Sequence, residues 1–298
     1  MDLPWGVIII YAALALWAAL LVDGWRRRSF RIFLGFGVLL MLVLNVRYFI
    51  EGTTGAIPFF IGIYDLLDNL GLSDSETAAA MASCPDNACT VWGDRFTRHP
   101  AWGVAFYERF INGSSFRNGL LYLHIAFNSV TFVLMHWQLA RPGSGNERQR
   151  NRHRLIGRVT FSTLTLGTLC AIILAAEHRS VGEYGGNLAM TGFWFMSLCV
   201  YGCAIMGVAA ARRADAGSHR IWMIRFAGSM WGAFWLFRVM LFVFDPLLRN
   251  YNAAALLISI WFSAPLGIAI AEWARHRFAA GSTRVPSPGV IPTPRTAG

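Results

Sequence analysis

The chain has 298 residues, of which 55% are hydrophobic and 14% charged, and its formal net charge is +10. Soluble domains carry about a quarter charged residues, so the excess of apolar side chains indicates contact with lipid. All 26 basic residues are arginines, and they cluster in short segments between apolar runs. No basic stripe with interleaved aromatic residues occurs in a polar domain, which argues against nucleic acid as a partner.

Seven apolar runs follow one another along the chain. Each has about the length that a helix needs to cross a hydrocarbon layer of ~30 Å. Lipid offers the backbone no hydrogen-bond partners, so the runs are predicted to be helices rather than open strands. The fold class is therefore predicted to be all-α, a polytopic membrane protein of about seven transmembrane helices in a lipid bilayer. The runs cover residues 5–22, 32–50, 119–140, 159–176, 187–211, 221–244 and 252–271.

A long polar stretch and a basic loop divide these runs into groups. The third to sixth helices are expected to form a four-helix bundle as the core, and a very basic loop is expected between the third and fourth. We predict two N-terminal transmembrane helices, an extracytoplasmic loop, a four-helix membrane domain, a C-terminal transmembrane helix and a disordered cytoplasmic tail. Their bounds are 1–50, 51–118, 119–245, 246–278 and 279–298.

The arginines indicate the orientation of the chain. The loops after the first, third, fifth and seventh runs, with the adjoining helix ends, hold 18 of the 26 arginines and four acidic residues, a net charge of +14. The other side holds eight arginines and twelve acidic residues, a net charge of −4. The positive-inside rule places the first side in the cytoplasm, with the N-terminus outside and the C-terminus inside. Cys84 and Cys89 then lie outside, where a disulfide between them could persist.

Two histidines begin helices within similar strings. His153 opens a His-Arg-x-x-Gly-Arg string and His219 a His-Arg-x-Trp-Met-x-Arg string. In a sequential bundle the fourth and sixth helices are diagonal, so two imidazoles at equal depth could hold one haem b. The neighbouring arginines, Arg158 and Arg225, could neutralise its propionates. The alternative is that these side chains only sit among lipid head groups or cap their helices.

Two further polar residues lie inside apolar runs. His124, a further candidate cofactor-binding residue, stands one turn before Asn128, and both could face the interior of the bundle. Arg238 lies deep in the sixth helix, where it needs an anionic partner or a water cavity. That partner could be Asp245, a haem propionate or an anionic substrate. Small residues at four-residue spacing in the fourth helix predict a close helix–helix contact: Thr163, Gly167, Ala171 and Ala175.

Residues 124–238 resemble the bacterial DUF2306 family of predicted membrane proteins. The resemblance rests on His124, the two His-Arg strings that begin at His153 and His219, the turn at Gly185 and Gly186, and Arg238. It implies a helical membrane domain in a bacterial inner membrane, without an established activity. The arrangement also loosely resembles cytochrome b561-type proteins, which implies haem.

The leading hypothesis is therefore a membrane redox protein that moves electrons between a quinone or cytoplasmic donor and an acceptor, with haem b held by His153 and His219. A non-enzymatic protein without a cofactor, either a small-solute transporter or an assembly subunit, is the main alternative. It predicts a cavity at Arg238. A membrane enzyme acting on lipid or quinone is a third possibility, and whether the chain is an enzyme stays open at this point.

Overall fold

The computed structural model describes residues 5–50, 52, 114–140, 146–176, 185–248 and 254–279. Within these ranges almost every residue is helical and no strand occurs. The predicted Cys84–Cys89 disulfide, nearly all of the 51–118 loop and the tail from residue 280 lie outside the described residues. The described part therefore agrees with the predicted all-α class.

The helices form seven rods in the described part, because a π-helical turn, η5, joins α10 to α11 in one continuous rod. The elements are α1 (Trp5–Arg27), α2 (Arg31–Ile50), α7 (Ser115–Ala140), α8 (Glu147–Ala176), α9 (Gly186–Arg212), α10 (Ala216–Trp231), η5 (Gly232–Leu236), α11 (Phe237–Leu247) and α12 (Ala254–Ala279).

Five of these helices are long and apolar enough to cross a membrane, namely α2, α7, α8, α9 and α12. By this criterion of length and composition the chain is a multi-pass integral membrane protein. The pieces of the sixth rod, α10 and α11, have 16 and 11 residues and are each too short to cross alone. The count of seven crossings therefore stays a prediction.

The helix α8 begins about three turns earlier than expected. We expected a basic loop up to residue 158, but the helix starts at Glu147. The side-chain oxygen of Asn146 accepts a hydrogen bond of 3.0 Å from the backbone N–H of Gln149, which caps the helix. Arginine favours helix and no proline interrupts this segment, so the basic stretch continues the transmembrane helix into the polar region.

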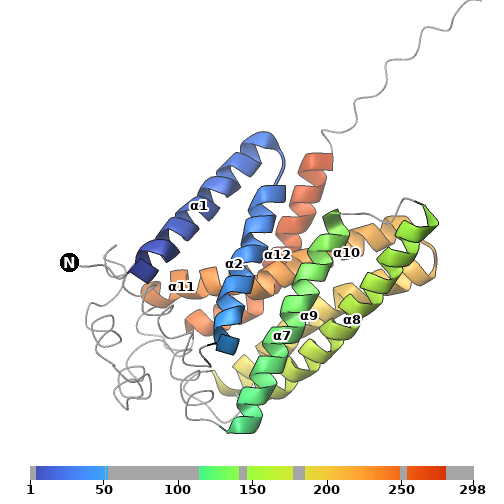
Figure 1. Cartoon of the computed structure of the whole chain (residues 1–298). Coiled ribbons are helices and arrows are strands. Elements are labelled where there is room, and N and C mark those ends of the chain that lie inside the picture. The colour runs from blue at the N-terminus through green and yellow to red at the C-terminus, as the bar shows by residue number, and fades with distance from the viewer. Residues whose placement is uncertain are drawn as a thin grey trace, which may run out of the picture.

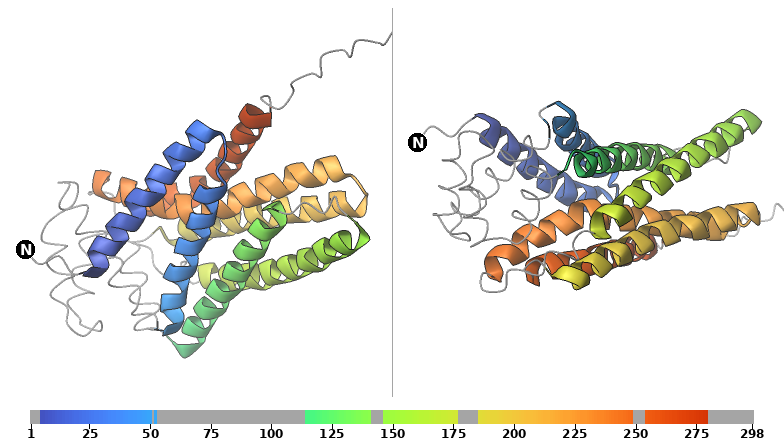
Figure 2. Two further views of the ribbon diagram at one scale, coloured as in Figure 1. Left: turned by 45° about the horizontal axis from the view of Figure 1, so that its top comes forward. Right: turned by 90° about the horizontal axis from the view of Figure 1, so that it is seen from below.

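Sequential neighbours pack side by side in the core. α7 packs against α8, α8 against α9, and α9 against α10, while α12 packs against α9, α10 and α11. The predicted four-helix core therefore has a fifth member, α12, that contacts its second half. Helix α2 packs against α7, and α1 against α2. Both also contact the sixth rod: the ring centroids of Trp17 and Trp235 lie 4.4 Å apart, and a Cβ on Gly37 would meet Trp231. Figures 1 and 2 show α1 and α2 on the α7 side of the bundle.

Small residues allow the closest contacts between helices. A Cβ atom on Gly267 of α12 would meet the carbonyl oxygen of Gly228 of α10. Between α7 and α8, the hydroxyls of Thr131 and Thr163 lie 2.8 Å apart, and a Cβ on Gly167 would meet the Asn128 side chain. The small-residue face of α8 is thus a helix contact, as its spacing predicts.

The helix ends rich in arginine lie on one side of the bundle. Figure 1 shows the C-terminal ends of α1, α7 and α12 on the same side as the N-terminal ends of α2 and α8. Arg26 and Arg27 occupy the last turn of α1, and Arg277 that of α12. Charge is therefore segregated toward one end of the rods.

Candidate functional site

Two histidines meet at the arginine-rich end. The ring centroids of His153 on α8 and His219 on α10 lie 6.3 Å apart, with the ring planes at 85°. The side-chain amide of Gln138 donates to the carbonyl oxygen of His153 at 3.0 Å and ties the start of α8 to the end of α7. Ring atom Nδ1 of His219 donates to the carbonyl oxygen of Gly207 on α9 at 2.9 Å. Both rings are partly exposed.

Two imidazoles at this separation could together hold a metal centre such as a haem iron. A metal–imidazole bond is roughly 2 Å and the ring centre lies about 1 Å beyond the nitrogen, so two imidazoles that would bind one metal ion can have centroids up to about 6 Å apart. A ligating histidine also characteristically donates its other N–H to a backbone carbonyl, as His219 does to Gly207. Because Nδ1 carries the proton, the lone pair of Nε2 of His219 is available to bind a metal. Among the described residues no group of three or more His, Cys, Asp or Glu side chains could hold a bare metal ion.

The arginines near this pair differ in their partners. Arg225 donates to a carboxylate oxygen of Glu272 on α12 at 2.7 Å and lies 4.5 Å from the Trp222 ring centroid. Arg275 donates to the other oxygen of Glu272 at 2.7 Å. Arg158 is exposed on α8. Arg225 is thus engaged in a contact between α10 and α12 that sequence analysis missed, because Glu272 is 47 residues away and no local pattern links the two.

His136 has both ring nitrogens occupied. Its Nδ1 donates to the carbonyl oxygen of Phe132 at 2.7 Å, and its Nε2 accepts from the indole N–H of Trp231 at 2.8 Å. A carbonyl oxygen can only accept, which places the proton on Nδ1. This histidine therefore serves as a structural link between α7 and α10.

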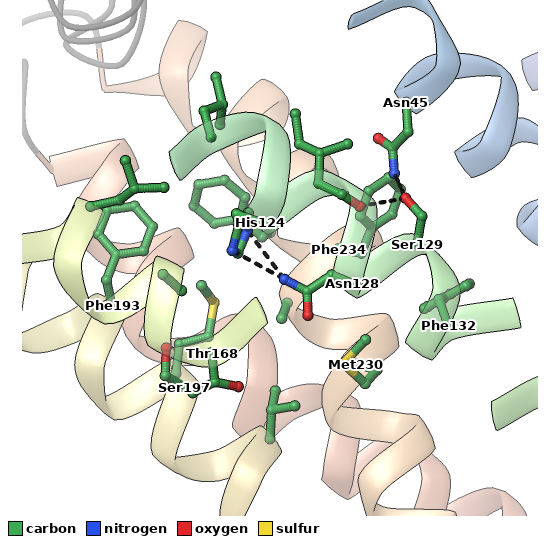
Figure 3. Close-up of a pocket in the computed structure, with 18 of the residues that line it drawn as sticks. Asn45, His124, Asn128, Ser129, Phe132, Thr168, Phe193, Ser197, Met230 and Phe234 are labelled. Atoms are coloured by element: carbon green, nitrogen blue, oxygen red, sulfur yellow. Dashed lines mark hydrogen bonds between the residues drawn. The ribbon is translucent and has the colours of Figure 1, made fainter. Parts of the chain in front are cut away.

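A cavity of about 370 Å³ lies within the bundle. Residues of α2, α7, α8, α9, the sixth rod and α12 line it, and its wall is mostly apolar. Figure 3 shows side chains from several helices converging on this space. The described polar residues that line it are Asn45, Tyr48, His124, Asn128, Ser129, Thr168, Ser197 and Arg238.

His124 and Asn128 form a hydrogen-bonded pair in the cavity wall (Figure 3). Ring atom Nδ1 of His124 donates to the carbonyl oxygen of Gly167 at 3.0 Å. The Asn128 amide nitrogen lies 3.0 Å from Nδ1 and 3.5 Å from Nε2. Since Nδ1 already donates to Gly167, Nε2 is the ring atom that can accept from the amide. Both side chains face the interior, as their one-turn spacing suggests.

Arg238 is held in place by a residue of the π-helical turn. Its Nη1 donates to the carbonyl oxygen of Phe234 at 2.7 Å, and the guanidinium carbon lies 4.0 Å from the Phe234 ring centroid. Among the described side chains no carboxylate lies within ion-pair distance of Arg238. The Asp245 side chain, one expected partner, lies outside the described residues. Single π-helical turns occur often at functional sites.

The expected site residues thus divide into two groups. Arg238 follows His219 by 19 residues on one rod, a rise of roughly 28 Å. The structure therefore does not bring Arg238 to the histidine pair, and a propionate of a haem at His219 could not reach it. His124 lines the same cavity as Arg238. Sequence analysis missed the contributions of α2 to this cavity, since Asn45 lies in an ordinary apolar run.

Comparison of the chain with protein-family models, with curated proteins and with solved structures found no match. The resemblances to the DUF2306 family and to cytochrome b561-type proteins therefore stay expectations from the sequence. The functional argument rests on the two sites themselves.

Proposed function

We propose that the chain is a membrane redox protein that holds haem b between His153 and His219. The observation that carries the proposal is the 6.3 Å separation of the two ring centroids. At this separation both imidazoles could bind one metal ion. The hydrogen bond from His219 to Gly207 supports it further, because it fixes the ring and its tautomer.

Haem b would supply one-electron chemistry, and the protein would supply ligands, position and field. Gly207 holds the His219 ring through its carbonyl oxygen, and Gln138 holds the backbone at His153. Arg158, exposed on the same helix as His153, would offset the charge of the propionates. A quinone in the bilayer or a cytoplasmic donor would be the electron partner, and the reaction class is electron transfer.

An absorbance spectrum of the purified protein tests this proposal. After expression with added haem precursor, the detergent-purified wild type is expected to show a Soret band and about one haem per chain. His153→Ala and His219→Ala are each expected to remove it. His276→Ala is the matched control, because its side chain is 70% exposed at the end of α12, and it should keep the band. A folded wild type without a Soret band contradicts the proposal.

The cavity favours a second candidate, a small-solute transporter without a cofactor. The observation that favours a transporter is the cavity of about 370 Å³, which Arg238 lines. Flux of a radiolabelled solute into proteoliposomes should then persist in His153→Ala and disappear in Arg238→Gln. The reverse result, flux lost only with His153, would exclude it. If the chain is instead an assembly subunit, a partner protein should co-purify with it and no solute flux should be seen.

We propose that the arginine-rich end faces the cytoplasm of a bacterial inner membrane, with the N-terminus outside. The proposal rests on the net charges of +14 and −4 on the two sides. An epitope inserted beside Asp86 should be reached by antibody on intact spheroplasts. An epitope at the C-terminus should be reached only after the membrane is opened. The opposite pattern would invert the orientation and place the histidine pair outside.

A further inference from the structure

We infer that the cavity around Arg238 and His124 binds a small organic carboxylate with an apolar body. This inference stands on the cavity alone and goes beyond both functions proposed above, since binding an anion requires neither haem nor transport. Three features of the cavity support it: its charge, the geometry of the charged group and the apolar character of its walls.

The charge in the cavity calls for an anion. Arg238 lines a mostly apolar space in the interior of the bundle, and no described carboxylate pairs with it. Arg238 is half-buried, and a guanidinium that loses water without gaining a counter-charge is destabilised by an amount on the order of several kcal/mol. His124, which lines the same cavity, cannot serve as the counter-charge, because an imidazole is either neutral or positively charged. A bound anion would neutralise the site.

The guanidinium is also positioned for a carboxylate. Arginine has five N–H donors in a planar fork, and within the described part of the chain Arg238 uses one of them on the Phe234 carbonyl. The Phe234 ring lies against the guanidinium carbon at 4.0 Å and restricts its rotation. The planar fork of guanidinium N–H groups matches the two oxygens of a carboxylate, which is why arginine binds this group in a bidentate manner.

The walls of the cavity favour a ligand whose remaining part, apart from the carboxylate, is apolar. Phe132, Phe193 and Phe234 line the space together with Met230 and Leu164, and Figure 3 places the labelled aromatic rings around it. The volume of about 370 Å³ lies toward the lower end of the range for small-molecule pockets, roughly 300–1,000 Å³. The uncharged polar groups, such as Thr168 and Ser197, could orient a ligand without adding charge.

Binding of matched acids and amides tests the inference. The purified protein in detergent is titrated by calorimetry with benzoate, hexanoate and 4-phenylbutyrate, and with the amide of each acid. The wild type is expected to bind at least one carboxylate about tenfold or more tightly than its amide, the effect of a charge-assisted hydrogen bond. Titration of empty micelles corrects for partition into detergent.

Four variants separate charge from volume. Arg238→Gln should abolish the preference for the acid, and Arg238→Lys should keep it in weaker form. Ser197→Leu fills the cavity and should weaken binding of the acid and the amide alike. Arg213→Gln, an exposed arginine between α9 and α10, is the matched control and should bind as the wild type does. Size-exclusion chromatography establishes that each variant is folded.

Three results would overturn the inference. They are equal affinity of the wild type for acid and amide, no measurable binding of any of the three acids, and an acid preference that survives in Arg238→Gln. If Arg238→Gln does not fold, the other two variants test the inference. Arg238→Lys must then show a weaker acid preference, and Ser197→Leu must show weaker binding of both acid and amide. Because binding is read by heat rather than by absorbance, a missing haem does not affect the result.

Discussion

The indole N–H of Trp231 donates a hydrogen bond of 2.8 Å to Nε2 of His136, and so joins the sixth rod to α7 across 95 residues of sequence. The same imidazole donates to Phe132 from its other nitrogen. Both side chains are partly buried, so a lost partner is not fully replaced by solvent. This link therefore has direct consequences for stability.

Trp231→Phe removes the indole donor and leaves Nε2 of His136 without a partner. We expect a loss of about 1–3 kcal/mol of unfolding free energy, the cost of an unsatisfied buried acceptor. Thermal unfolding in detergent measures it. A double-mutant cycle with His136→Leu should give a coupling of about 1 kcal/mol. Strictly additive effects would mean that the hydrogen bond contributes nothing.

Glu272→Gln should destabilise the contact between α10 and α12. The carboxylate pairs with Arg225 and Arg275, and the three side chains are between 20% and 31% exposed. We expect a loss of about 1–3 kcal/mol, because two cations would share a site without a counter-charge.

The surface pair on α1 provides the control for this change. Asp23 and Arg27 form an ion pair of the same length, 2.7 Å, with exposures of 39% and 74%. Asp23→Asn should change stability by less than about 0.5 kcal/mol. Equal effects of the two substitutions in thermal unfolding would show that the partial burial of Glu272 does not strengthen its ion pairs.

Gly267→Ala should separate α10 from α12. The new methyl would meet the backbone of Gly228, which cannot move aside as a flexible side chain can. Overpacking of this kind costs about 1–3 kcal/mol. Gly202→Ala in α9 is the control, since no atom lies within 4 Å of its new Cβ. It should be neutral or stabilising by up to about 1 kcal/mol. A similar loss of unfolding free energy in both variants would mean that the contact between Gly267 and Gly228 is not the cause.

Arg225→Gln should lower stability without changing haem content. Arg225 donates to Glu272, so its charge is already matched within the protein. The ratio of Soret absorbance to folded protein should therefore equal that of the wild type, while the unfolding midpoint falls. A lost Soret band in a variant of normal stability would instead place Arg225 at the cofactor.

The helical fold followed from the sequence because the bilayer imposes simple rules. Runs of about 20 apolar residues become helices, and the structure has helices at all seven predicted runs within its described part. Their ends were harder to predict. Helix α8 begins at Glu147 because Asn146 caps it, and a hydropathy pattern does not register such a cap.

The candidate sites were only partly predictable. The matched strings at His153 and His219 indicated two imidazoles at equal depth, and the rings lie 6.3 Å apart. The isolated arginine at position 238 suggested a cavity, and a cavity is present there. Nothing in the sequence linked Arg225 to Glu272 or Trp231 to His136, since these pairs depend on tertiary contacts between distant helices.

By itself, the sequence predicted which segments are helical, and the described helices agree with it. How they alternate across the bilayer, and at what depth each polar residue stands, are predictions from the same pattern. These properties depend on length and hydropathy along one dimension. Only the tertiary structure decided that His124 shares a cavity with Arg238, and that both stand apart from His153 and His219. The rotation and tilt of each helix are set by contacts such as that of Gly228 with Gly267, which form only when the whole bundle packs.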